Sequence, residues 1–265
     1  MTSPWIASLI AIFLWWFSTG AILVAIRRAD RLGSHGMTVF AGLPLLALGV
    51  WAVAASLPSA TVSGVYLGFA GALAIWGWIE LAFLAGVITG PVRSDCPPGL
   101  DGRARFMRAF GTISYHELAL TLGLWALVMA SHGAENRIAV ATYLVLFLAR
   151  IMAKLNLFFG VPRINVEFVP DRLQHLTSYF RRGPVTLAFP IAVTLLTALL
   201  AICAERLLSA SSAPTVVGYT LLTAMAGLAL LEHWLMVIPL PDAKLWRWML
   251  PPVHPLPKTM TKEER

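Results

Sequence analysis

The chain has 265 residues, of which 58% are hydrophobic and 12% charged, and its formal net charge at pH 7 is +7. With a mean hydropathy of +0.75, it is far too apolar for a soluble globular domain. This composition excludes the soluble protein classes and predicts an all-α, polytopic membrane protein, a bundle of transmembrane helices.

Seven stretches contain the roughly 20 mostly apolar residues that a helix needs to cross a bilayer core. In chain order they are residues 5–26, 37–57, 62–88, 106–130, 138–159, 184–208 and 215–240. The first run is too long for the core of a signal peptide and no side-chain cation precedes it, so we expect it to remain as the first span. The sequence thus predicts one seven-helix transmembrane domain over residues 1–250 and a short, disordered cytoplasmic tail over residues 251–265.

Lys and Arg residues gather in the connections on one side of these spans. The loops after the first, third and fifth spans and the tail carry fifteen: Arg27, Arg28, Arg31, Arg93, Arg103, Arg105, Arg163, Arg172, Arg181, Arg182, Lys244, Arg247, Lys258, Lys262 and Arg265. The loops on the other side carry Arg137 and Arg206. Because cytoplasmic loops are enriched in cations, we predict an amino terminus outside and a cytoplasmic carboxyl terminus. Cations scattered through short loops also argue against nucleic acid binding.

Local signals refine this outline. Trp15 and Trp16 lie near the middle of the first span, where packing against neighbouring helices is favoured over contact with a pigment or lipid. Pro44 predicts a kink in the second span, and Gly90 with Pro91 is typical of a helix end.

Two segments outside the spans are expected at the membrane surface. In the fifth loop, residues 171–182 predict an amphipathic helix lying on anionic headgroups, with Leu173, Leu176, Tyr179 and Phe180 on its apolar stripe. Residues 246–248 (WRW) predict an anchor below the seventh span.

Ionisable residues inside the predicted spans are the strongest chemical signal, because each costs a few kcal/mol in lipid unless it is paired. Four spans carry them about ten residues from their cation-rich ends, which is about 15 Å along a helix. They are Glu80, His116, Glu117, Arg150, Lys154, Glu232 and His233. We expect them to form one buried, salt-bridged layer near the bilayer midplane, facing the inside of the bundle.

Neighbouring members of this layer differ in direction. Arg150 and Lys154 are four residues apart and share a helix face. The pairs 116–117 and 232–233 are adjacent, about 100° apart around a helix, so the two members of each pair are not expected to aim equally well at one point.

Four interpretations of the layer stay open. It can fix helix register, or supply His116 or His233 as the axial ligand of a magnesium tetrapyrrole. It can form an iron or zinc site of two histidines and three carboxylates, although no Glu-x-x-His pair supports this. It can also line a proton or solute path. No catalytic residue and no metal ligand is assigned from the sequence.

Eight short strings resemble the PuhE family, whose members are identified as photosynthetic complex assembly proteins of purple and related phototrophic bacteria. In order they are residues 15–20 (WWFSTG), 76–80 (WGWIE), 89–91 (TGP), 96–99 (CPPG), 115–119 (YHELA), 153–158 (AKLNLF), 180–182 (FRR) and 231–234 (LEHW). The likeness runs from the first span to the seventh and leaves only the tail uncovered.

This resemblance implies a factor for assembly of reaction-centre and light-harvesting complexes, or for regulation of the bacteriochlorophyll supply, in the cell inner membrane or the intracytoplasmic photosynthetic membrane. Expected partners are subunits of those complexes or pigment-synthesis proteins, together with membrane lipid. Bacteriochlorophyll or a precursor is the ligand to consider. The resemblance implies no catalytic residue, so we expect no enzyme activity. A membrane enzyme acting on a tetrapyrrole precursor, and a small-solute or proton transporter, are the alternatives.

Overall fold

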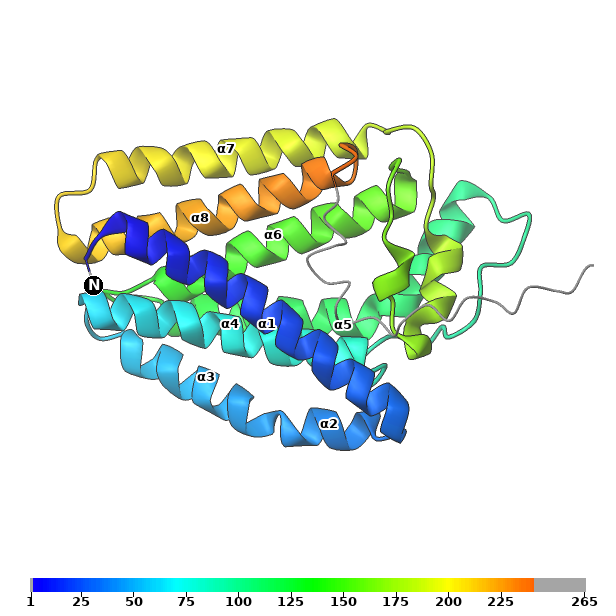
Figure 1. Cartoon of the computed structure of the whole chain (residues 1–265), viewed down its shortest axis with the longest axis horizontal. Coiled ribbons are helices and arrows are strands. Elements are labelled where there is room, and N and C mark those ends of the chain that lie inside the picture. Colours follow the sequence, from blue (N-terminus) through cyan, green and yellow to red (C-terminus); the bar gives the residue numbers. More distant parts are fainter. Residues whose placement is uncertain (1, 241–265) are drawn as a thin grey trace, which may run out of the picture.

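The computed structural model describes residues 2–240 as a bundle of roughly aligned helices (Figure 1). Within that range there is no strand. The helices are α1 (Pro4–Leu32), α2 (His35–Ala41), α3 (Leu43–Ser56), α4 (Val62–Leu84), α5 (Gly102–Ala130), α6 (Ile138–Phe159), α7 (Ala188–Leu208) and α8 (Ala213–Leu235), with two 3₁₀ helices, η1 (Val166–Phe168) and η2 (Asp171–Tyr179).

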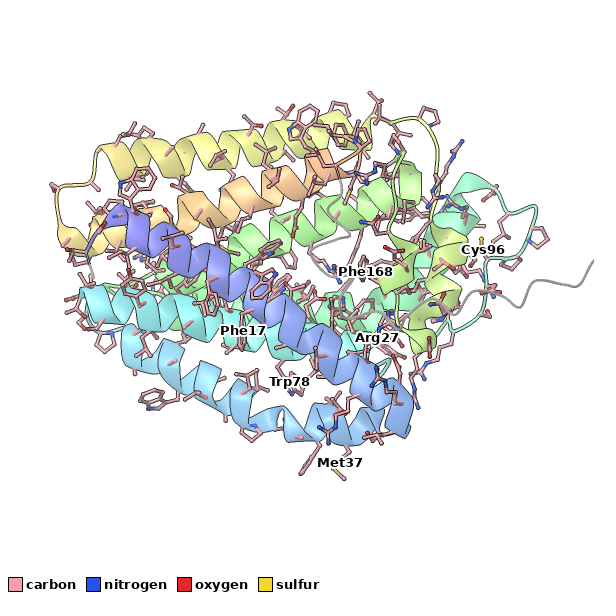
Figure 2. All side chains as sticks on the ribbon, viewed as in Figure 1. Phe17, Arg27, Met37, Trp78, Cys96 and Phe168 are labelled. Atoms are coloured by element: carbon pink, nitrogen blue, oxygen red, sulfur yellow. The ribbon has the colours of Figure 1, made fainter. Side chains whose placement is uncertain are left out.

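The all-α transmembrane fold class is confirmed. Seven helices within residues 2–240 are long and apolar enough to cross a membrane, α2 and α3 together making one of them. Large apolar side chains such as Phe17 and Met37 lie on the outer surface, with 55% and 67% of their area exposed (Figure 2). Lipid is the solvent that such a surface requires. The tail and the predicted anchor at residues 246–248 lie outside the described residues.

The cation-rich connections all lie at one end of the bundle, on the right in Figure 1. They are residues 33–34, which follow Arg27, Arg28 and Arg31 at the end of α1, residues 85–101, which precede Arg103 and Arg105 at the start of α5, and residues 160–187. The alternation of spans is therefore as predicted. The side of the membrane that this end faces stays a prediction.

Two helix boundaries have clear local causes. α4 ends before the predicted position because Gly86 takes a φ of 70°, the left-handed conformation that commonly follows a helix. α5 begins at Gly102 because the Asp101 carboxylate accepts a hydrogen bond from Ala104 N at 2.6 Å, as a helix cap does.

The kink predicted in the second span is a complete break. α2 ends and α3 begins at Gly42, so that Pro44 lies in the first turn of α3, where its missing N–H costs nothing. The Trp78 indole of α4 donates to the Val39 carbonyl at 3.2 Å beside this break. The two short helices thus follow α4 as one bent span.

Helix α4 lies at the centre of the bundle, because 61% of its most apolar window is buried, against 44% or less in the other spans. Its closest neighbour is α3, and the crossing depends on Gly49 and Gly71. A Cβ on Gly71 would lie 2.9 Å from the Gly49 carbonyl oxygen. Small residues at such crossings let membrane helices approach closely.

The substitution Gly71→Ala is therefore expected to lower the free energy of unfolding by about 1 to 3 kcal/mol, the usual cost of overpacking. Thermal unfolding of the purified protein in detergent, followed by circular dichroism, measures the change. Gly77→Ala in the same helix is the control, because its Cβ would be 3.8 Å from the nearest atom, in Ile22. Equal losses in the two variants would contradict this account of the crossing.

Residues 164–180, here called the cap, close the cation-rich end of the bundle. Leu173, Leu176 and Tyr179 recur every three residues and so lie on one side of the 3₁₀ helix η2. All three are buried, and the two leucines cluster with Phe83 of α4. The predicted amphipathic α-helix on lipid headgroups is wrong, because this stripe packs against the protein.

Polar contacts hold the cap in place. Arg105 of α5 donates to the carbonyl oxygens of Tyr179 at 2.6 Å and of Phe158 at 3.3 Å. Arg27 near the end of α1 donates to the Glu167 carbonyl at 3.1 Å, and Figure 2 labels Arg27 and the neighbouring cap residue Phe168. Burial lowers the pKa of His175, which favours a neutral imidazole in the cap at pH 7.

Candidate functional site

A backbone contact fixes the middle of α5 against the chain that follows α4. The amides of Tyr115 and His116 donate to the Thr89 carbonyl at 2.9 and 3.1 Å. Gly90 allows this approach, since a Cβ there would lie 2.1 Å from the carbonyl oxygen of Gly111. The Thr89-Gly90-Pro91 string, predicted only as a helix end, thus also positions His116. Gly90 and Gly111 were the sequence signal for a close approach of these two segments, but the sequence does not show that the two glycines meet.

Five of the seven predicted site residues meet in one polar cluster. Arg150 Nη2 of α6 donates to Glu80 Oε2 of α4 at 2.7 Å. His116 Nε2 of α5 lies 3.5 Å from Glu80 Oε1, and its Nδ1 lies 3.0 Å from Lys154 Nζ. Lys154 also donates to the Glu117 carboxylate. Three spans are therefore tied together by one connected set of charges.

An aromatic ring covers this polar cluster. Phe83 stacks on the His116 imidazole with ring centroids 4.1 Å apart and an angle of 25°. Lys154 Nζ lies 5.7 Å and Arg150 Cζ 6.0 Å from the Phe83 centroid, within cation–π range. The same ring also clusters with Leu173 and Leu176, so it contacts both the polar cluster and the apolar part of the cap.

The prediction that adjacent residues diverge is wrong for His116 and Glu117. The Lys154 ammonium contacts both of them, because it lies at the end of a long, flexible side chain. The two side chains do leave the helix in different directions, but the Lys154 side chain is long enough to reach both of them.

Glu232 and His233 do diverge. Glu232 lies on an exposed part of α8, interacts electrostatically with Arg150 and accepts a hydrogen bond from the Trp15 indole. It therefore borders the polar cluster. His233 is 1% exposed, and its Nδ1 lies 2.8 Å from the Ala229 carbonyl one turn earlier. The layer predicted for all seven residues is therefore wrong for two of them: His233 lies outside it, and Glu232 is exposed and only borders it.

The two histidines predicted as pigment ligands, His116 and His233, differ in whether a ring nitrogen keeps a lone pair for a metal ion. Because the Lys154 ammonium can only donate, His116 accepts at Nδ1 and keeps its proton on Nε2, facing Glu80. Neither nitrogen of His116 is then free for a magnesium ion. Because a carbonyl can only accept, His233 carries its proton on Nδ1 and keeps a lone pair on Nε2, which has no hydrogen-bond partner among the described residues.

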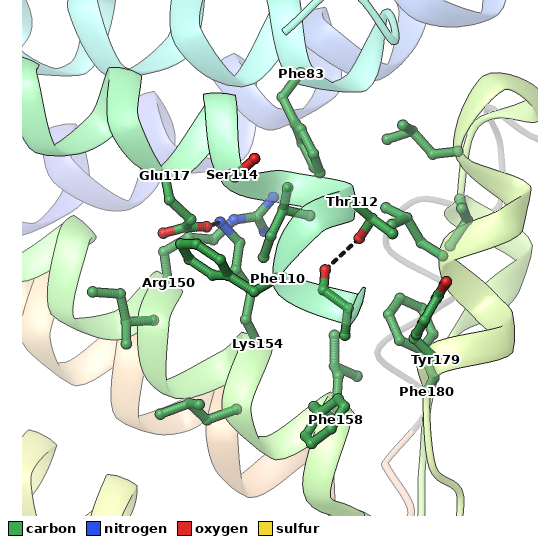
Figure 3. A pocket seen from close by; sticks show the side chains of 18 of the residues that line it. Phe83, Phe110, Thr112, Ser114, Glu117, Arg150, Lys154, Phe158, Tyr179 and Phe180 are labelled. Atoms are coloured by element: carbon green, nitrogen blue, oxygen red, sulfur yellow. Dashed lines mark hydrogen bonds and ion pairs between the residues drawn. The ribbon is translucent and has the colours of Figure 1, made fainter. Parts of the chain in front are cut away.

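A cavity of about 860 Å³ adjoins the polar cluster between α5, α6 and the cap. Figure 3 shows Glu117, Arg150 and Lys154 gathered at one side of it, with Tyr179 and Phe180 of the cap at the other. The rest of the wall is mostly apolar and rich in phenylalanine. Its volume is within the range of about 300 to 1,000 Å³ found for sites of small molecules and cofactors.

The cavity could not be predicted from the sequence, because the cap forms one of its walls and hydrophobic periodicity does not determine the conformation of a loop. Residues 2–240 contain no group of three or more His, Cys, Asp or Glu side chains placed to hold a metal ion. The site is thus an apolar cavity with a charged end.

Fold and site together define a polytopic helical membrane protein with a buried ion-paired cluster. The family described as "Protein of unknown function (DUF3623)" matches residues 1–256, and the chain belongs to this family. A Rhodobacter capsulatus protein named "Uncharacterized 30.4 kDa protein in puhA 5'region" is 46% identical over 264 residues, which cover 99% of this chain and 96% of that protein. No solved structure matches the chain.

The ion pair between Glu80 and Arg150 makes a direct prediction about stability. Glu80→Gln should lower the free energy of unfolding by about 1 to 3 kcal/mol, because Arg150 keeps its charge at lipid depth without its closest partner. The double variant Glu80→Gln/Arg150→Gln should recover part of this loss, because two neutral amides can bond to each other. Thermal unfolding in detergent measures both variants.

The matched control is Glu205→Gln at the opposite end of the bundle. That carboxylate is 67% exposed and lies 3.5 Å from Arg206, so its loss should change the stability very little. A double variant that is less stable than either single variant would contradict the pairing.

Proposed function

We propose that this protein is a PuhE-like membrane factor that supports assembly of photosynthetic reaction-centre and light-harvesting complexes, or regulates the supply of bacteriochlorophyll to them. The observation that carries the proposal is the identity of 46%, over nearly the whole chain, with a Rhodobacter capsulatus protein whose name refers to the puhA 5′ region. The eight PuhE-like strings are in keeping with that name. A multi-pass helical protein would act in the cell inner membrane or the intracytoplasmic membrane.

We further propose that the cavity beside the polar cluster is where the protein contacts a pigment or a pigment precursor. Its phenylalanine-rich wall matches the apolar, flat body of a tetrapyrrole in chemistry, and its volume is ample for a ligand of moderate size. The charged groups at its end pair with one another, which supports binding more directly than acid–base catalysis. Neither His116 nor His233 lines this cavity, so this proposal does not depend on axial ligation by either of them.

Affinity purification from phototrophically grown cells tests this proposal. We expect the tagged protein to carry photosynthetic subunits or pigment-synthesis proteins, together with a tetrapyrrole absorption band. Ala109→Trp, which fills the cavity from α5, should remove that band, whereas Ala54→Trp on the exposed face of α3 should leave it. A colourless preparation that contains no photosynthetic protein would overturn the proposal.

One observation favours a proton path as a second candidate function. Glu80, His116, Lys154 and Glu117 form an uninterrupted series of titratable groups from the interior to the cavity wall. Proton flux into proteoliposomes that is lost in Lys154→Met would support a transporter. Turnover of a tetrapyrrole precursor by the purified protein would support the enzyme alternative.

A further inference from the structure

The cavity beside the polar cluster has two chemically different ends. Its ionisable groups, apart from the Tyr179 phenol, are Glu117, Arg150 and Lys154, and all three lie at one side (Figure 3). The opposite side and the remaining wall are built mostly from aromatic and aliphatic side chains of α5, α6 and the cap. A ligand that fills such a cavity has an apolar body and a polar group at one end.

The charged end has unused hydrogen-bond donors. The Arg150 side chain is 34% exposed and donates from Nη2 to Glu80, and no other hydrogen bond of its guanidinium is found among the described residues. A guanidinium has five N–H donors, so most of them stay available. Lys154 contacts His116 and Glu117, which leaves one of its three ammonium protons.

The balance of charge at this end favours an anion. The cavity wall carries two cations, Arg150 and Lys154, one helical turn apart on α6, and one carboxylate, Glu117. The second carboxylate of the cluster, Glu80, pairs with Arg150 at 2.7 Å but does not line the cavity, so only the groups that face the cavity have a surplus of cations. An anionic group would accept hydrogen bonds from the spare donors, whereas a cationic group would face two like charges.

We propose that the cavity binds an amphiphile whose apolar body lies among the phenylalanines and whose anionic group, a carboxylate or a phosphate, is held by Arg150 and Lys154. This inference rests on the proposed use of the cavity and names the chemistry that its ligand carries. Both an anionic lipid and a tetrapyrrole with a free carboxylate have this chemistry, and the experiment separates these two sources.

Binding to the unaltered, purified full-length protein in a neutral detergent provides the test. The lipid arm compares palmitate with methyl palmitate, by displacement of a fluorescent polyene fatty acid. The tetrapyrrole arm compares protoporphyrin, which has two free carboxylates, with its dimethyl ester, by fluorescence titration. In at least one arm we expect the acid to bind at least tenfold more tightly than the ester, a difference of about 1.4 kcal/mol.

Substitutions locate the binding. Arg150→Met and Lys154→Met should each weaken binding of the acid at least tenfold and leave that of the ester nearly unchanged. Arg137→Met, at an exposed site at the opposite end of the bundle, removes the same charge as the control and should change neither. Ala109→Trp should abolish both. Because Arg150 also pairs with Glu80, its loss can unfold the protein, but the comparison of acid with ester needs no variant.

The outcomes separate this inference from the proposed function. If porphyrin acid and ester bind equally well and palmitate does not bind, the anion site is refuted while pigment contact is supported. If palmitate binds more tightly than its ester and neither porphyrin binds, the anion site is supported and the ligand is a lipid, which refutes pigment contact at this cavity. If no acid binds more tightly than its ester, the inference is overturned.

Discussion

The ion pair between Glu80 and Arg150 is the interaction on which the rest of the structure depends. A charge at lipid depth is tolerated only when it has a partner, and these two residues lie on α4 and α6, 70 positions apart in the chain. Their pairing fixes the rotation of both helices, because a turn of either helix would expose a charge to hydrocarbon. His116, buried between this pair and Lys154, extends the same constraint to α5.

The cavity is a consequence of the same arrangement. Since the polar cluster draws the three helices together at one level, α5 and α6 leave space beyond it, and the cap fills only part of that space. Phe83 contacts both His116 of the polar cluster and the cap leucines. The stability of the bundle and the shape of the cavity therefore depend on shared residues, and a substitution in the polar cluster should affect both.

The class of fold and the meeting of the five cluster residues could be predicted from the sequence, because hydropathy and helix rise are properties of single helices. The rotation of each helix about its axis could not be predicted. Glu232 and His233 show this limit, since one residue position decides which of them faces Arg150. Sequence reasoning also missed the cap, whose 3₁₀ path depends on donors from distant helices, such as Arg105. Tertiary contacts of this kind have no periodic signature.

The attachment of the cap bears on how this family can diversify. Arg105 binds the cap through the main-chain oxygen of Tyr179 and α6 through that of Phe158, and every amino acid carries such an oxygen. Cap side chains that face the cavity, such as Val169 and Phe180, are not needed for that attachment. Mutation can therefore change the shape of one cavity wall while the hydrogen bond from Arg105 to the cap persists, so that relatives with the same membrane bundle can differ in the shape of this cavity.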